Sequence, residues 1–126
     1  MRDIEGGQLE VYRRDTGNKE FVPMDTVADY VTNILHDMQK NLLETNKKLR
    51  EDNTVSVDTY DDFKKALDDG KFIMAQWDGT SETELKIKEE TKATIRCIPL
   101  DNPQEDGKCI LTGKPSKERV LFARAY

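Results

Sequence analysis

The residues that could catalyse a reaction are few and scattered in this chain of 126 residues. His36 is the only histidine, and it lies between Leu35 and Asp37 on a predicted helix, where a partly exposed structural histidine is the ordinary role. No serine, cysteine or lysine is placed with it as a nucleophile with its base. The glycines are isolated except for Gly6-Gly7, so no glycine-rich phosphate loop is present. These residues predict no catalytic turnover of their own.

Acidic residues are plentiful but are arranged as solubilising charges. Many occur as adjacent pairs on predicted helices, and adjacent residues do not share a helix face. A pair of cooperating carboxylates is therefore not predicted at the three tandem pairs, which are Asp61-Asp62, Asp68-Asp69 and Glu89-Glu90.

The two cysteines, Cys97 and Cys109, are interpreted as thiols, because a disulfide between them would need an oxidising compartment. Cys97 alternates with Ile95 in a predicted strand, which favours a small core residue. Cys109 begins a turn of the kind that supplies two cysteines to zinc ribbons, but Thr112 stands at the second position. The sequence thus offers one good zinc ligand where four are needed.

The first part of the chain predicts a hairpin followed by a long helix. Residues 8–14 and 20–22 alternate between apolar and polar types on either side of a turn at Asp15-Thr16-Gly17-Asn18. Apolar residues then recur at helical spacing from about residue 25 to 52. The apolar positions become sparse after Gln39, which favours a strut between two units, with the boundary near Thr54.

The second part predicts a two-layer domain in the order β, α, β, α, β, β. Strands are expected at Val55 and Val57 and over residues 72–77, 93–98 and 120–125. One helix begins with a capping box at Thr59 and ends at Gly70; the other spans residues 81–92 and is anchored by Leu85 and Ile87. Residues 99–119 are expected to form a loop. The fold class is therefore α+β, with both helices on one face of a mixed sheet.

The charge distribution allows only a local contact with RNA. The net charge is −5, from 20 basic and 25 acidic residues, which argues against a surface that coats a polyanion. The end of the chain is basic, since from residue 108 onward Glu118 is the only acid among five cations: Lys108, Lys114, Lys117, Arg119 and Arg124. The longest apolar runs are too short to span a bilayer and the start does not resemble a signal peptide, so a cytosolic location is expected.

Five strings in the sequence, in this order and spacing, carry a family resemblance. They are Arg2-Asp3-Ile4-Glu5-Gly6-Gly7-Gln8, Arg13-Arg14-Asp15-Thr16-Gly17, residues 87–99 (IKEETKATIRCIP), Gly113-Lys114-Pro115, and Val120-Leu121-Phe122-Ala123-Arg124-Ala125-Tyr126. Together they resemble prolyl-tRNA synthetases of the archaeal and eukaryotic type, and the likeness extends over essentially the whole chain.

The resemblance implies two domains. Residues 1–53 are similar to the end of the anticodon-binding domain, where Arg2 and Asp3 would lie in the loop that approaches the anticodon. A cation and a carboxylate both suit recognition of base edges, although the same two residues could simply solvate a loop. Residues 54–126 resemble the extra C-terminal domain of this family. In relatives the chain terminus folds back toward the catalytic domain, so Tyr126 is expected to dock there; the alternative is that its ring covers the end of a strand.

The resemblance also implies four positions at which many relatives bind a structural zinc ion. These positions fall on Asp78, Thr83, Cys109 and Thr112, and only Cys109 retains a cysteine. Because a closed zinc site needs four strong ligands, we expect that zinc has been lost. The loop must then be held by packing and by hydrogen bonds, for instance bonds of Asp78 and Thr83 with backbone amides.

The function implied by the resemblance is that of a synthetase fragment. The parent would ligate proline to its tRNA with ATP and Mg²⁺ and would act as a homodimer. This fragment would be inert alone, would need no cofactor of its own, and would brace the anticodon-binding and catalytic domains. The alternatives are a free-standing RNA-binding or ribosome-associated α/β module and, with less support, a small thiol or metal protein built around Cys97 and Cys109.

Overall fold

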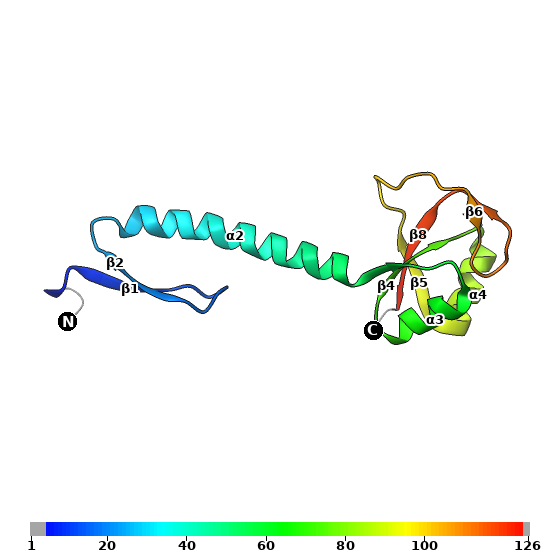
Figure 1. Ribbon diagram of the computed structural model, residues 1–126, viewed down its shortest axis with the longest axis horizontal. Coiled ribbons are helices and arrows are strands. Elements are labelled where there is room, and N and C mark those ends of the chain that lie inside the picture. The colour runs from blue at the N-terminus through cyan, green and yellow to red at the C-terminus, as the bar shows by residue number, and fades with distance from the viewer. Residues whose placement is uncertain (1–4, 125–126) are drawn as a thin grey trace. The chain divides into compact units, whose positions relative to one another are not determined.

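The computed structural model describes residues 5–124, and the contacts divide the chain into two compact units, Met1–Arg50 and Glu51–Tyr126. Figure 1 shows the elements of both units. No helix of the described part is long and apolar enough to cross a membrane.

The first unit contains the predicted hairpin and the long helix. Strands β1 (Gln8–Tyr12) and β2 (Lys19–Pro23) pair antiparallel. The turn between them needs a glycine, because Gly17 has a φ of 74°, in the left-handed region. Helix α2 (Val27–Asp52) follows. None of the α2 residues is buried, and Val22 is the only buried residue among the described residues of this unit.

The second unit is built on a four-stranded mixed sheet with the strand order β3-β4-β8-β5. Strands β3 (Thr54–Ser56) and β4 (Phe72–Gln76) are parallel. Strand β8 (Arg119–Arg124) runs antiparallel both to β4 and to β5 (Ala93–Cys97). The predicted α+β class and the mixed sheet are therefore confirmed.

Helix α3 (Tyr60–Asp68) starts and ends where local sequence chemistry predicts. The hydroxyl oxygen of Thr59 accepts from the backbone N–H of Asp62, as an N-cap does. Past the last turn, Gly70 has a φ of 71° and donates to the carbonyl of Leu67, while Lys71 donates to the carbonyl of Ala66. This pair of hydrogen bonds is the Schellman arrangement, and it satisfies carbonyls that the helix leaves unpaired.

Both helices pack on the same face of the sheet, as predicted. On this face lie Ile73 and Ala75 of β4, which pair in register with Phe122 and Val120 of β8. The rings of Phe63 in α3 and Phe122 meet edge to face, with centroids 5.2 Å apart. These five residues belong to one core cluster with four further residues that are at most a tenth exposed: Ala66, Leu67, Ile87 and Ala93. In Figure 1, α3 and α4 lie together at one side of the strands.

The anchoring of helix α4 (Ser81–Thr91) corrects a prediction. Leu85 is 55% exposed and does not anchor the helix. The buried positions are Thr83, Ile87 and Thr91, which are four residues apart and therefore share a face. The apolar type of Leu85 suggested burial, but the helical phase set by Ile87 turns it toward solvent.

Two further predictions about residues 93–119 were wrong. Cys97 is exposed and not a core residue. A β-bulge follows Ile95, so Cys97 pairs with Leu121 and is turned to the face opposite Ile95. Residues 99–119 were predicted to be a loop, but they contain a short hairpin, in which β6 (Gly107–Lys108) pairs with β7 (Pro115–Ser116). Strands of two residues that contain glycine or proline are too short to show the alternation of apolar and polar residues from which a strand is predicted.

Candidate functional site

Asp78 accepts hydrogen bonds from three threonine side chains where β4 leads into α4. Its Oδ1 accepts from the hydroxyl of Thr80, the N-cap of α4, at 2.9 Å and from the Thr80 backbone N–H at 3.2 Å. Its Oδ2 accepts from the hydroxyls of Thr83 at 2.9 Å and Thr112 at 2.8 Å. Thr112 lies in the turn between β6 and β7, so this carboxylate ties that hairpin to the start of α4.

The ionised form of Asp78 is the one that this arrangement stabilises. Partial burial by itself would raise the pKa of Asp78, but hydrogen bonds from Thr112, Thr80 and Thr83 together outweigh it and lower the pKa below its ordinary value. Since hydroxyls and a backbone amide donate to both carboxylate oxygens, the side chain acts as a structural acceptor and not as an acid or a base.

The positions predicted to be a degenerate zinc site are partly brought together. Asp78, Thr83 and Thr112 share the hydrogen bonds above, while Cys109 is buried at the start of the same turn as Thr112. The expected bond of a backbone amide to Asp78 is donated by Thr80, whereas Thr83 bonds to Asp78 through its side chain. Within residues 5–124, no three His, Cys, Asp or Glu residues lie close enough together to hold a metal ion. The donor set does not fit zinc, because hydroxyls are weak zinc ligands and the carboxylate is already engaged.

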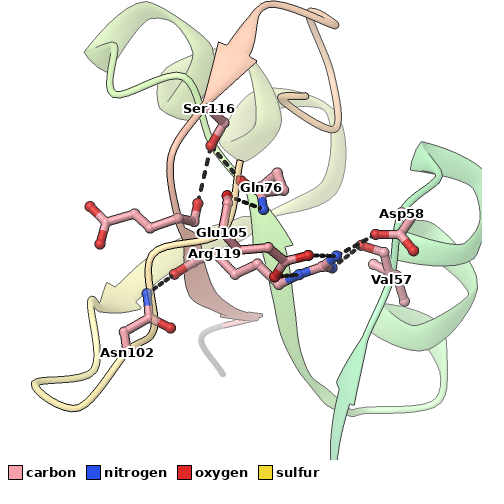
Figure 2. A network of polar contacts seen from close by, with 8 residues as sticks. Val57, Asp58, Gln76, Asn102, Glu105, Ser116 and Arg119 are labelled. Atoms are coloured by element: carbon pink, nitrogen blue, oxygen red, sulfur yellow. Dashed lines mark hydrogen bonds and ion pairs between the residues drawn. The ribbon is translucent and has the colours of Figure 1, made fainter. Parts of the chain in front are cut away.

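Arg119 centres a second polar network, which sequence reasoning did not find (Figure 2). Its guanidinium donates to both carboxylate oxygens of Glu105 at 2.8 and 3.0 Å, to the carbonyl of Val57 at 3.0 Å and to Asp58 at 2.6 Å. The backbone carbonyl of Arg119 accepts from the side chain of Asn102 at 2.7 Å. The fork to Glu105 raises the pKa of Arg119 and lowers the pKa of Glu105. Arg119, a residue of β8, thus joins the segment that follows β3 to the segment before β6.

Gln76 extends this network into the sheet. Its side-chain nitrogen donates to the carbonyl of Glu105 at 3.1 Å, and its side-chain oxygen lies 2.6 Å from the hydroxyl of Ser116. Gly107 packs so tightly on Gln76 that an added Cβ would lie 2.7 Å from the amide carbon. Residues 98–106 are therefore held in place although they form no helix or strand. The one available signal for this network in the sequence was an arginine directly before the apolar residues 120–123.

The hairpin and α2 share a smaller set of polar contacts. Asp15 accepts a fork of two hydrogen bonds from Arg13, at 2.8 and 3.0 Å, and a third from Asn41 at 2.9 Å. The hydrogen bond from Arg13 is the main cause that lowers the pKa of Asp15 to about 2. Tyr30 of α2 donates to Glu20 of β2 at 2.7 Å. These contacts fix the turn at residues 13–18 against the helix. The predicted RNA-contacting residues Arg2 and Asp3, and the predicted docking residue Tyr126, lie outside the described residues.

A hollow of about 700 Å³ opens beside the ends of β4 and β8. Leu67, Phe72 and Ala123 line it with apolar surface, and three cations stand around them: Lys71, Arg96 and Arg124. No carboxylate, histidine or thiol lines it among the described residues. Such a lining suits contact with an apolar and anionic group and offers no general base.

Comparison with known proteins gives a consistent result. Residues 60–126 match the family model described as "Prolyl-tRNA synthetase, C-terminal". The chain belongs to the prolyl-tRNA synthetase family. The family assignment made from sequence motifs is thereby confirmed; its narrower attribution to the archaeal and eukaryotic type stays a prediction.

Curated relatives from this synthetase family are identical to the chain at more than half of the aligned positions. A proline–tRNA ligase of Porphyromonas gingivalis is 54% identical over 125 residues, that of Parabacteroides distasonis 55% over 125 residues, and that of Cytophaga hutchinsonii 56% over 126 residues. Each alignment covers 99% of this chain but only 25–26% of the relative. The chain thus spans about a quarter of the length of the curated relatives it matches.

Proposed function

We propose that this chain is the C-terminal part of an enzyme that ligates proline to its tRNA with ATP and Mg²⁺. The observation that carries the proposal is the identity of 54–56% to proline–tRNA ligases across 99% of the chain. The chain itself contributes no chemical step. Its role is to connect the anticodon-binding region, residues 1–53, with a C-terminal domain, residues 54–126, that docks on the catalytic part.

The arrangement of the described side chains supports this non-catalytic role. His36 lies on α2, which has no buried residue, and no hydrogen bond joins it to a serine, cysteine or lysine in the described part of the chain. The most connected polar groups, Asp78 and Arg119, use their bonding capacity on their own fold. ATP and Mg²⁺ are accordingly assigned to the remainder of the enzyme.

The proposed partners follow from the same assignment. Proline tRNA would be contacted through the anticodon-binding region, with Arg2 and Asp3 next to the anticodon. Tyr126 and the terminal carboxylate would dock on the catalytic domain, where a ring and a carboxylate suit an apolar pocket with cations or amides. We further propose that the complete enzyme is a homodimer of the cytoplasm.

The test is attachment of proline to tRNA by a complete enzyme that carries this chain. The intact enzyme is compared with versions truncated at Ala125 and at Leu100, and circular dichroism confirms that each is folded. We expect charging by the intact enzyme and its loss in both truncated versions. An intact enzyme that charges no tRNA with proline would contradict the proposed activity. A version truncated at Ala125 that charges normally would contradict the role of Tyr126.

A further inference from the structure

The sheet of the second unit has one face that α3 and α4 do not cover. Side chains alternate across a strand, so the core positions Ile73 and Phe122 put their neighbours on the opposite face. There, Phe72 is 40% exposed, and Met74 and Leu121 are partly exposed. This side of the sheet therefore presents apolar groups to solvent.

The segment at residues 98–106 adds apolar side chains at one end of this face. Gln76 and Arg119 pair in register and point to the same face as Met74, and both hold Glu105 of the segment. Within the segment, Leu100 is fully exposed and Ile98 about half exposed. We use the term "open face" for this surface of six residues: Phe72, Met74, Cys97, Ile98, Leu100 and Leu121.

Leu100 is exposed although hydrogen bonds fix the loop that carries it, and this combination indicates a role for the side chain at the surface. A flexible loop could fold a leucine inward, but the bonds of Asn102 and Glu105 to Arg119 fix this loop with Leu100 outside. Ordering a loop has an entropic cost, and leaving a large apolar side chain in water forgoes its burial. A group of exposed apolar side chains on one side of a sheet is typical of an interaction site.

The cations around the hollow beside Phe72 favour a partner that carries negative charge. Lys71 and Arg124 already bond to neighbours, Asn53 and Asp68 respectively. Within residues 5–124, no hydrogen bond or ion pair engages the guanidinium of Arg96, which is exposed and lines the hollow. A partner with a carboxylate opposite Arg96 and apolar side chains opposite Leu100 and Leu121 would complement both parts.

We infer that the open face is the surface on which the remaining three quarters of the same polypeptide docks. This rests on the proposed function, in which the chain is about a quarter of a longer enzyme. A protein partner fits better than RNA, because proteins bind single-stranded RNA with aromatic side chains that stack on the bases, on a positively charged surface. Phe72 is the only aromatic residue of the open face, and the chain carries a net charge of −5.

The thiol of Cys97 allows a direct test. It is exposed next to Leu121, whereas the buried Cys109 is an internal control in the same domain. The alkylation rate of each is measured by mass spectrometry, in this chain alone and in the complete enzyme. Because thiol reactivity follows exposure, we expect Cys97 to react at least about tenfold more slowly in the enzyme, with Cys109 slow in both. Equal Cys97 rates would overturn the inference, and so would protection of Cys97 in the isolated chain by added tRNA.

Substitutions in the complete enzyme locate the contact. Leu100→Asp and Arg96→Glu are each expected to restore rapid alkylation of Cys97. Leu85→Asp is the control, since Leu85 is also an exposed leucine but lies on α4, on the covered side of the sheet. Continued protection of Cys97 in both open-face variants would overturn the inference.

Charging of tRNA, measured on the same samples, separates this inference from the proposed function. An enzyme that charges proline tRNA while Cys97 remains fully reactive would refute the docking surface alone. An enzyme that protects Cys97 but does not charge proline tRNA would refute the proposed activity alone.

Discussion

Both units of this chain contain large apolar side chains, but the second unit buries them in a core and the first unit leaves most of them exposed or only partly buried. The second unit buries Phe63, Ile73 and Phe122 completely between a sheet and two helices. The first unit buries Val22 alone among its described residues, and eight of its large apolar side chains are exposed: Tyr12, Phe21, Met24, Val31, Leu35, Leu42, Leu43 and Leu49. An amphipathic hairpin and helix do not make a core without a second layer on their apolar side. The second unit is expected to fold by itself, and the first to depend on sequence that completes its sheet.

The largest expected effect is on the core of the second unit. Phe122→Ala removes a fully buried ring that meets Phe63, and should lower the free energy of unfolding by about 3–5 kcal/mol. Urea denaturation followed by the fluorescence of Trp77, which packs against this core, measures it. The control Leu85→Ala, at an exposed position, should change stability by less than about 0.5 kcal/mol. Equal effects of the two substitutions would mean that the second unit has no independent core.

The next effect concerns the segment at residues 98–106. Arg119→Leu removes the donors to Val57 and Glu105 and should cost about 1–2 kcal/mol, because the carboxylate partners are exposed and solvent screens them. Hydrogen exchange should rise selectively at residues 98–106. Arg119→Lys keeps the charge but not the fork, so an intermediate effect is expected. Unchanged exchange in Arg119→Leu would show that other contacts hold this segment.

A smaller, pH-dependent effect is expected at Asp78. Asp78→Ala should destabilise the second unit by roughly 1–2 kcal/mol near neutral pH, because the hydroxyls of Thr83 and Thr112 lose their acceptor. Folding lowers the pKa of this carboxyl, so its contribution is present above the ordinary carboxyl pKa and is lost as the pH falls through the folded value. The stability difference between the two proteins, measured by urea denaturation at several pH values, should shrink on acidification. A difference that does not change with pH would contradict ionisation of Asp78 as its cause.

The smallest effect is expected in the first unit and gives the sharpest comparison. Val22→Ala and Val120→Ala delete the same atoms from residues that are 4% and 0% exposed. Val120→Ala should cost about 2 kcal/mol or more, since the surrounding core cannot close the cavity. Val22→Ala should leave the unfolding of the second unit unchanged when Trp77 fluorescence reports it. A comparable loss from Val22→Ala would show that the two units unfold as one.

The local parts of this structure could be predicted from the sequence because short-range chemistry determines them. The cap at Thr59, the end of α3 at Gly70 and the hairpin turn at Gly17 each depend on residues within a few positions. The burial of Leu85 was predicted wrongly because the prediction relied on its apolar type and not on its position around the helix, which is set by the buried Ile87. The exposure of Cys97 was missed because a bulge shifts the side-chain alternation without leaving a mark in the sequence.

By itself, the sequence determined the family, the order of the main elements and the α+β class. Only the tertiary structure decided which polar groups meet. Asp78 and Thr112 are 34 residues apart in the chain and 2.8 Å apart in space, and Arg119 reaches Val57 across 62 residues. Strand pairing creates such contacts, and no local pattern encodes them. The open face has the same origin, because a sheet face becomes a surface only once the helices have packed on the other side.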